Sequence, residues 1–425
     1  MMDRQKKTEI LAPAGDMERL QSALDFGADA VYLGGQLFGM RAGAPNFNPE
    51  MLCEAVRLAH SRNVRVYLTV NTLPRNPEFA LLPEFIANAV RAEVDALIIA
   101  DLGVFQMVRE LAPDMPIHMS TQTGIVNYAT ANALYQMGAR RVVLARELSL
   151  EEIAEIRAHT PEDLELEVFV HGAMCVSFSG RCLLSAYFTD RDANRGACAQ
   201  PCRWKYYLTE EKRPHLPMEI QEEPEGTYIL NARDMCMIDH LDKLAQAGVT
   251  SFKIEGRAKS AYYVSVITNA YRMAMDEYLK NPENYQLPAW IHEEVFKVSH
   301  RRYCTGFFFG HPNACQYYEN SGYIASCDVV GIVRKCENGR IYATQRNRFF
   351  AGDQLEILAP GQQPVVIRPE KIYNAENQEI QTVNHAMMEF SFDYDFNNPE
   401  YKTFPANSII RMPVKNPIPE ETEIR

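Results

Sequence analysis

Short apolar segments alternate with amphipathic segments over about the first 280 residues of the chain. The amphipathic segments, such as 16–26 and 83–92, have the 3.6-residue period of helices that pack one face against a core. Eight apolar runs have the length of buried strands, and they lie at 10–12, 30–34, 64–70, 96–100, 117–120, 142–145, 166–170 and 251–255. The pattern therefore predicts a succession of strand–helix units.

The junction between a predicted helix and the next strand has a recurring form. Gly27, Gly138 and Gly248 each stand where a helix should end, and Val94 begins a fourth junction of this kind without glycine. Glycine lacks the Cβ atom that opposes a positive φ. We therefore expect the three glycines to form left-handed caps.

Eight strands with helices between them predict a parallel (β/α)8-like barrel over residues 1–285. An open, doubly wound parallel sheet has the same local pattern, and periodicity does not distinguish the two. Residues 286–321 are expected to connect the barrel to a second domain. From 322 to 425 short alternating strands, with turns at 337–340 and 351–353, predict a small β-barrel.

Polar residues follow the predicted strands, where a barrel of this kind carries its chemistry. The catalytic residues are not identified by this pattern, but His171, Glu255 and Asp101 are candidates. The other polar strand ends are Asn71, Ser120, Thr121, Gln122, Arg146, Glu147 and Arg257. Any one of them could equally be a hydrogen-bonded loop residue.

The composition is that of a globular protein, and the net charge of −12 disfavours indiscriminate binding to nucleic acid or acidic membranes. No apolar run of 18 residues and no secretory signal is seen, so a cytoplasmic protein without a membrane partner is expected. In that compartment the ten cysteines should be reduced thiols. The acidic, proline-containing stretch 209–226 is expected to be a solvated loop.

Five of the cysteines are candidates for one metal centre. Cys175, Cys182, Cys198 and Cys202 lie within 28 residues, and Cys236 follows on the next predicted helix. Thiolates suit both tetrahedral zinc and an iron–sulfur cluster. The intervals from Cys175 through Cys182 and Cys198 to Cys236 contain 6, 15 and 37 residues, which favours a cluster over the close pairs of zinc sites. Cys202 is the spare thiol in this assignment, although it could replace Cys198.

The segment from Cys175 to Lys205 also contains basic and aromatic side chains. Five basic residues against two acidic ones leave it a net charge of +3, and the segment includes Arg181 and the aromatic residues Phe178, Tyr187, Phe188 and Trp204. Such a combination suits the phosphates and bases of a single-stranded nucleic acid. The alternative is that the arginines pair with carboxylates and the aromatic rings belong to the core.

Several motifs resemble one known family. The stretch 167–185 reads Glu-x-Phe-x-x-Gly-Ala-Met-Cys-x-x-x-x-Gly-x-Cys-x-Leu-Ser, which is similar to the signature of the collagenase-like peptidases of unassigned catalytic type. The segments 11–16, 27–34 and 255–259 resemble the first and last barrel units of that family. The likeness extends over nearly the whole chain.

The resemblance implies an activity and its cofactors. Several members are oxygen-independent hydroxylases, and one branch forms 5-hydroxyuridine at the wobble position of tRNA, with prephenate as oxygen donor. The C-terminal extension is similar to that branch. In related hydroxylases four cysteines hold a 4Fe-4S cluster, and their positions match Cys175, Cys182, Cys198 and Cys236. The dianionic prephenate would need arginines at the rim, for which Arg146 and Arg257 are candidates, with Arg41 behind them; Arg181 and Trp204 are further substrate-binding candidates.

Two other functions stay open. The family name implies a peptidase, but residues 292–296, His-Glu-Glu-Val-Phe, lack the second histidine of a zinc-protease helix, and no Gly-x-Ser-x-Gly elbow is present. A non-catalytic role as one subunit of a hydroxylase complex, paired with a paralogous chain, is the third possibility.

Overall fold

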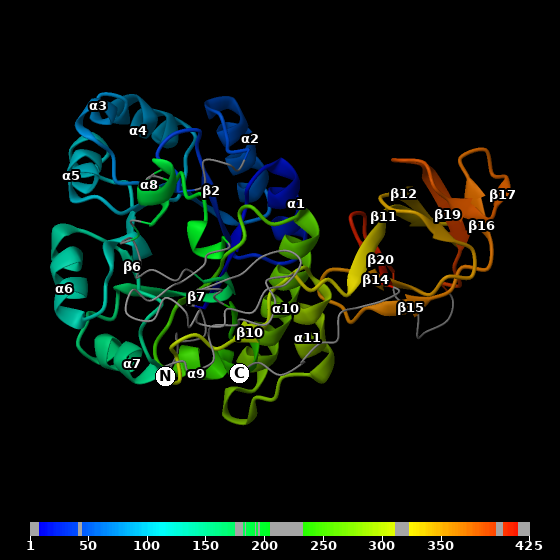
Figure 1. Cartoon of the computed structure of the whole chain (residues 1–425). Helices are drawn as coiled ribbons and strands as arrows, with labels where there is room; N and C mark the ends of the chain where they lie inside the picture. Colours follow the sequence, from blue (N-terminus) through cyan, green and yellow to red (C-terminus); the bar gives the residue numbers. More distant parts are fainter. Residues whose placement is uncertain are drawn as a thin grey trace, which may run out of the picture.

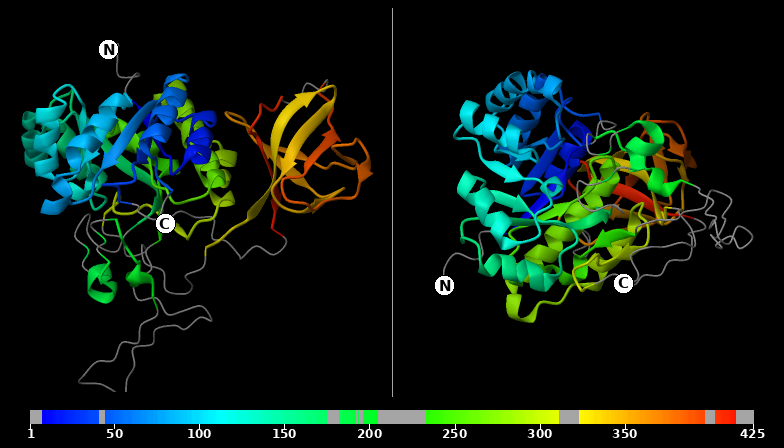
Figure 2. Two further views of the ribbon diagram at one scale, coloured as in Figure 1. Left: turned by 90° about the horizontal axis from the view of Figure 1, so that it is seen from above. Right: turned by 60° about the vertical axis from the view of Figure 1, so that its left-hand side comes forward.

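The computed structural model describes residues 8–40, 45–174, 182, 184–191, 193, 196–204, 233–310, 323–396 and 403–414. Within them, a parallel barrel is followed by an antiparallel β-domain, which lies to one side of the barrel next to helices α10 and α11 (Figures 1 and 2). No described helix is both long enough and apolar enough to span a bilayer.

The barrel contains eight parallel strands, and each lies within or beside one of the eight predicted runs. They are β1 (Glu9–Pro13), β2 (Ala30–Gly34), β3 (Arg65–Val70), β4 (Ala96–Ile99), β5 (Ile117–Met119), β6 (Arg141–Val143), β7 (Glu165–Ala173) and β9 (Ser251–Ile254). Strand β9 pairs with both β1 and β7, which closes the ring. This closure confirms the barrel and excludes the open sheet.

Helices surround the barrel (Figure 1), and their inner faces are apolar. They are α1 (Met17–Asp25), α2 (Pro49–His60), α3 (Asn76–Phe79), α4 (Leu82–Arg91), α5 (Leu102–Leu111), α6 (Tyr128–Met137), α7 (Leu150–Ala158), α9 (Leu241–Gln246) and α10 (Ala261–Lys280). The junction glycines Gly27, Gly138 and Gly248 have φ values of 94°, 110° and 90°, so the expected left-handed caps are confirmed.

Two short strands extend the sheet outside the closed ring. Strand β8 (Asp234–Cys236) runs antiparallel to the end of β7, and β10 (Tyr303–Cys304) pairs with β8. Cys236 therefore lies on a strand, and its prediction on a helix was wrong. The segment 286–321, expected to be a connection, contributes α11 (Ala289–Glu294) and β10 to the barrel domain. Helix α8 (Leu184–Thr189) lies in the insertion between β7 and β8.

The C-terminal domain is a curved antiparallel sheet with its own apolar core. Its strands are β11 (Cys327–Glu337), β12 (Arg340–Gln345), β13 (Phe349–Phe350), β14 (Leu355–Leu358), β15 (Val365–Ile367), β16 (Ile372–Asn374), β17 (Glu379–Ile380), β18 (Thr382–Val383), β19 (Glu389–Asp393) and β20 (Ile409–Pro413). The predicted turn between β11 and β12 is present, with positive φ at Asn338 and Gly339. The small β-barrel of the prediction is therefore an antiparallel half-barrel.

A buried ion-pair cluster joins the two domains. Arg411 on β20 is fully buried, and its guanidinium contacts Glu294 of α11 at 2.6 Å and Glu356 of β14 at 2.7 Å. Lys297 bridges the same two carboxylates at 3.0 Å. Leu358 and Ile409 of the C-terminal domain also belong to the apolar core of the barrel. Polar and apolar contacts thus hold the two domains together.

We expect Arg411→Ala to destabilise the protein strongly, because it leaves two carboxylates at the interface with only Lys297 to compensate them. The loss of unfolding free energy should be about 3–5 kcal/mol, measured by urea denaturation. The double variant Arg411→Ala/Glu294→Gln should regain part of this loss, because it removes one uncompensated charge. An unchanged denaturation midpoint in Arg411→Ala would contradict the role of this cluster.

Candidate functional site

A pocket with a cavity volume of about 60 Å³, partly open to solvent, lies at the carboxyl ends of the barrel strands; we call it the rim pocket. Seven of its residues are polar strand ends that the sequence indicated: Asn71, Ser120, Thr121, Gln122, Arg146, Glu255 and Arg257. Five others complete the lining: Tyr32, Met40, Thr69, Phe169 and Lys253. Closure of the barrel brings these residues together, because parallel strands all end on the same face.

Arg257 is a buried cation of the rim pocket. It is 3% exposed, and its guanidinium donates hydrogen bonds to the Asn46 Oδ1 atom at 2.5 Å and the Thr69 Oγ1 atom at 3.2 Å. A Cβ atom on Gly34 would lie only 2.3 Å from the Arg257 Nη2 atom, so the close approach of this guanidinium to β2 requires glycine there. These contacts fix the orientation of the positive charge.

Arg146 lies on another wall of the pocket with fewer partners. Its guanidinium carbon lies 3.9 Å from the centre of the Phe169 ring, and its Nη1 atom donates to the Ala173 carbonyl at 3.2 Å. The Nε–H group is buried and has no hydrogen-bond acceptor in the described part of the chain. A guanidinium held by a ring and one carbonyl is well suited to bind a carboxylate or phosphate.

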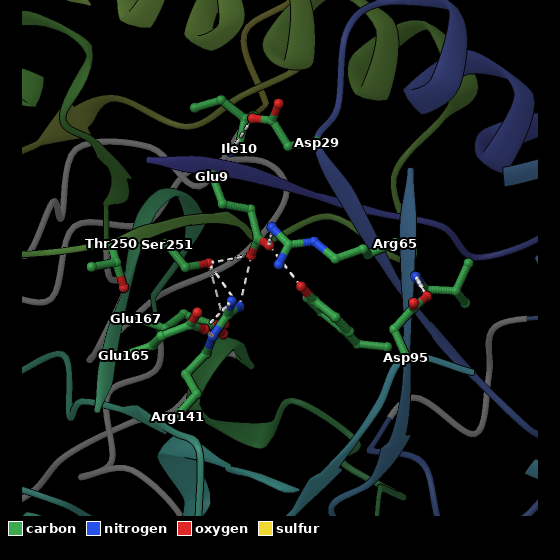
Figure 3. Close-up of polar contacts among 12 residues, drawn as sticks. Glu9, Ile10, Asp29, Arg65, Asp95, Arg141, Glu165, Glu167, Thr250 and Ser251 are labelled. Atoms are coloured by element: carbon green, nitrogen blue, oxygen red, sulfur yellow. Dashed lines mark hydrogen bonds and ion pairs between the residues drawn. The ribbon is translucent and has the colours of Figure 1, made fainter. Parts of the chain in front are cut away.

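Charged side chains lie inside the barrel below the pocket (Figure 3), next to a buried apolar cluster made of Leu11, Ala30, Tyr32, Tyr67, Ala96 and Ile98. Arg141 contacts Glu9 at 2.7 Å and Glu167 at 2.9 Å, and the Ser251 hydroxyl donates to Glu9 at 2.8 Å. Lys253 contacts Glu167 at 2.7 Å. Burial by itself raises the pKa of the Glu9 carboxyl, but the Arg141 guanidinium, together with Arg65 and the Tyr67 hydroxyl, outweighs that effect and the pKa falls to about 2. The interior is therefore a set of compensated charges.

His171 lies deeper than the rim pocket and is 1% exposed. Its Nδ1 atom is 3.3 Å from the Tyr271 hydroxyl, and its Nε2 atom is 3.2 Å from the Tyr303 hydroxyl. Burial, with His300 and Lys259 nearby, holds the pKa of the imidazole well below its usual value. His171 is thus a neutral ring, and it lies in a crevice too small for a water molecule, which Arg146 and Glu255 also line.

Two family models match the chain along most of its length. Residues 15–317 match peptidase family U32, and residues 325–411 match the C-terminal domain of peptidase family U32. The chain belongs to peptidase family U32. The resemblance to the collagenase-like peptidases is confirmed.

Curated relatives of this U32 chain have names of two kinds. The tRNA hydroxylation protein P1 of Bacillus subtilis is 35% identical over 405 residues, 95% of this chain and 94% of its own. The tRNA hydroxylation protein P of Escherichia coli is 36% identical over 396 residues, 83% of this chain and 86% of its own. The Collagenase of Porphyromonas gingivalis is 35% identical over 312 residues, 71% of this chain and 73% of its own.

Two of the predicted cluster cysteines, Cys198 and Cys236, lie on segments that contact elements of the rim pocket. In the antiparallel pairing of β8 with β7, Cys236 lies opposite His171, close to the end of the strand from which Cys175 follows. The Cys198 segment packs on the loop after β2, since a Cβ atom on Gly196 would lie 2.7 Å from the Gly39 carbonyl oxygen. Met40, which lines the pocket, is the next residue of that loop.

The thiols suit a cluster chemically, but the described ones do not form a ligand group. Cys236 is fully buried and burial raises the pKa of its thiol to about 12, whereas Cys198 is exposed. Among the described residues, no three His, Cys, Asp or Glu side chains are arranged to hold a metal ion. Cys175 lies outside the described residues. The cluster therefore stays a prediction, and no chemical step is derived from it.

Two other predicted site residues, Asp101 and Trp204, do not line the rim pocket. Asp101 is the N-cap of α5, where its carboxylate accepts from the Gly103 and Val104 backbone amides at 2.8 and 3.0 Å. That contact explains a polar residue at this strand end. Trp204 is 43% exposed. Arg41 and Arg181 lie outside the described residues, as does the acidic stretch 209–226.

Sequence analysis missed Lys253, Tyr32 and Thr69, which lie within strands and not at their ends. One signal was present in the sequence. Lys253 and Glu167 are charged residues inside otherwise apolar strands, and such a residue must either face solvent or find a compensating charge. In a barrel strand that is buried on both faces, a compensating charge was to be expected.

Proposed function

We propose that this protein hydroxylates tRNA, forming 5-hydroxyuridine at the wobble position with prephenate as oxygen donor. The tRNA hydroxylation relatives, which align with almost the whole chain, support the reaction class. The observation that carries the proposal is the rim pocket, in which Arg146 and Arg257 present two guanidinium groups beside a cysteine-containing segment.

The two arginines suit a dianionic donor. Arg257 is oriented by Asn46 and Thr69, and the Nε–H group of Arg146 has no acceptor among the described residues. Prephenate has two carboxylates, and a guanidinium pairs with a carboxylate through two parallel hydrogen bonds. Each arginine would take one carboxylate, which holds the donor in a single orientation in the pocket.

The tRNA would approach the rim pocket from the side of the cysteine segment. Phe188 of α8 and Trp204 are 47% and 43% exposed, and the neighbouring residue Gly196 packs against the pocket loop. The wobble base lies in a single-stranded loop, so it can leave the stack and rest on an aromatic ring. A base held there lies on the same side of the barrel as the donor.

The proposed cofactor is a 4Fe-4S cluster held by Cys175, Cys182, Cys198 and Cys236. When bound, such a cluster supplies one-electron or Lewis-acid chemistry, which an oxygen transfer without dioxygen requires. Strand β8 brings Cys236 to the end of β7, and this arrangement favours its membership in the ligand set. The contribution of the protein itself is to orient the donor through its arginines.

The test is nucleoside mass spectrometry of tRNA from a strain that lacks the gene. We expect 5-hydroxyuridine and its derivatives to disappear and to return when the gene is restored. Unchanged amounts in a strain without a second U32 gene would refute the proposal. An assay of the purified protein with tRNA and prephenate distinguishes an enzyme from a non-catalytic subunit, because only an enzyme modifies the tRNA by itself. Bacillus subtilis has relatives named P1 and P2, so a paralogous partner should be added if the chain alone is inactive.

A peptidase is the second candidate, since relatives are named Collagenase and uncharacterized protease. The described site does not favour it. Cys236 and His171 face each other across β8 and β7, but the thiol is fully buried and the ring is 1% exposed, so a peptide has no access to them. Hydrolysis of gelatin by the purified protein, lost on substitution of a rim-pocket residue, would establish this function instead.

A further inference from the structure

A lysine side chain lies at the floor of the rim pocket and has no part in the function proposed above. Lys253 projects from β9, lines the pocket and is 4% exposed. Its Nζ atom lies 4.6 Å from the centre of the Tyr32 ring and 5.3 Å from that of Phe169. A lysine ammonium is rarely buried to this extent without a specific partner.

The partner is Glu167 of β7, whose Oε1 atom lies 2.7 Å from the Lys253 ammonium. The other oxygen of Glu167 accepts from Arg141 at 2.9 Å and lies 3.3 Å from the Ser251 Oγ atom, whose proton goes to the closer Glu9. The close-up in Figure 3 shows Glu167 held between these two groups. Since Glu167 is fully buried and held on both oxygens, it fixes the position of the ammonium.

The hydrogen bonds of Lys253 are incomplete in the described structure. An ammonium has three N–H donors. Only one acceptor, the Glu167 carboxylate, lies within hydrogen-bonding distance of this group among the described residues. The other two N–H donors have no acceptor there. Leaving buried donors without acceptors is costly. A ligand in the pocket can supply the missing acceptors.

We propose that Lys253 is a ligand-binding cation that receives an anionic oxygen at the floor of the rim pocket, and that Glu167 positions it. The inference rests on the proposed function only in taking the rim pocket as the donor site. It adds a third cation below Arg146 and Arg257, so the pocket selects a small molecule with acidic or enolate oxygens at both ends. In this role Lys253 acts as a cation held by the Glu167 ion pair and not as an amine nucleophile.

The experiment measures anion binding to the anaerobically purified protein with its native metal content. The midpoint of thermal unfolding is followed against the concentration of two probes, prephenate and inorganic sulfate, to obtain a dissociation constant for each. The variants are Lys253→Met, Glu167→Gln and the double variant, in which both charges are removed and the interior keeps its volume. Lys280→Met is the control, since Lys280 is exposed on α10, the helix that follows β9.

We expect Lys253→Met to weaken the binding of both probes by about 10- to 100-fold, the value of one charge-assisted contact. Glu167→Gln should weaken binding less, and should have no further effect when Lys253 is already Met. A purely structural role of Glu167 would instead weaken binding in both backgrounds. Lys280→Met should bind as the wild type does.

The outcomes separate this inference from the proposed function. If both Lys253→Met and the double variant bind prephenate as the wild type does, the inference is overturned, but prephenate remains the proposed donor. If the wild type binds sulfate but not prephenate, and Lys253→Met loses sulfate binding, the inference is supported and prephenate is excluded as the donor. If the wild type binds neither probe, both are refuted. An adduct on Lys253 after treatment with pyruvate and borohydride would show a nucleophilic amine and overturn the inference.

Discussion

Replacing Cys182 by alanine should remove the colour of the anaerobically purified protein and abolish tRNA modification. With four thiolate ligands we expect about four iron and about four sulfide per chain in the wild type. Loss of one ligand opens the cluster to solvent and to oxidation, so iron content should fall well below the wild-type value. The measurements are the visible absorption spectrum, iron and sulfide analysis, and the 5-hydroxyuridine content of tRNA.

Cys202→Ala is the matched control, because Cys202 lies on the same segment as Cys198 and is the spare thiol of the assignment. It should keep both the colour and the activity. Cys198 is exposed, and its Sγ atom lies 3.4 Å from the Gln200 amide nitrogen, which shows a turn that leaves this thiol accessible. If the Cys202→Ala protein were colourless, Cys202 would be the ligand and Cys198 the spare thiol. Zinc in place of iron in the wild type would refute the cluster.

Arg146→Met should raise the KM for prephenate by about 10- to 100-fold, because it removes one charge-assisted pair with a carboxylate. The KM for tRNA should change little, since the guanidinium lies inside the rim pocket, stacked on Phe169. Methionine retains most of the side-chain volume, and no ion pair of Arg146 with a described residue is broken. The measurement is the initial rate of 5-hydroxyuridine formation at varied prephenate and at varied tRNA.

Arg140→Met is the control for this change. Arg140 directly precedes β6, at the opposite end of the barrel strands, and its side chain is 60% exposed beside Asp163. It should leave both KM values unaltered. If Arg146→Met lowered kcat with an unchanged KM for prephenate, Arg146 would act on the reacting atoms and not as a donor anchor.

Arg146 and Asp101 illustrate how far a polar strand end can be interpreted from sequence. Both follow apolar runs, and the local pattern does not distinguish them. Arg146 lines the rim pocket, whereas Asp101 caps the helix that begins at the next residue. The Asp-Leu-Gly-Val sequence is typical of a cap followed by a first helical turn, so this role was visible locally. For Arg146 no such local partner exists.

The sequence by itself determined the eight barrel strands, the glycine caps between helix and strand and the polar character of the strand ends, because all three depend on residues that are close together in the chain. Only the tertiary structure decided the closure of β9 onto β1 and β7 and the place of Cys236 beside the end of β7. It also decided the convergence of Glu9, Arg141, Glu167 and Lys253 inside the barrel. These features join residues that are up to 244 positions apart. Periodicity reports which face of an element is buried, but it does not specify the partner, since pairing over such distances depends on the whole fold.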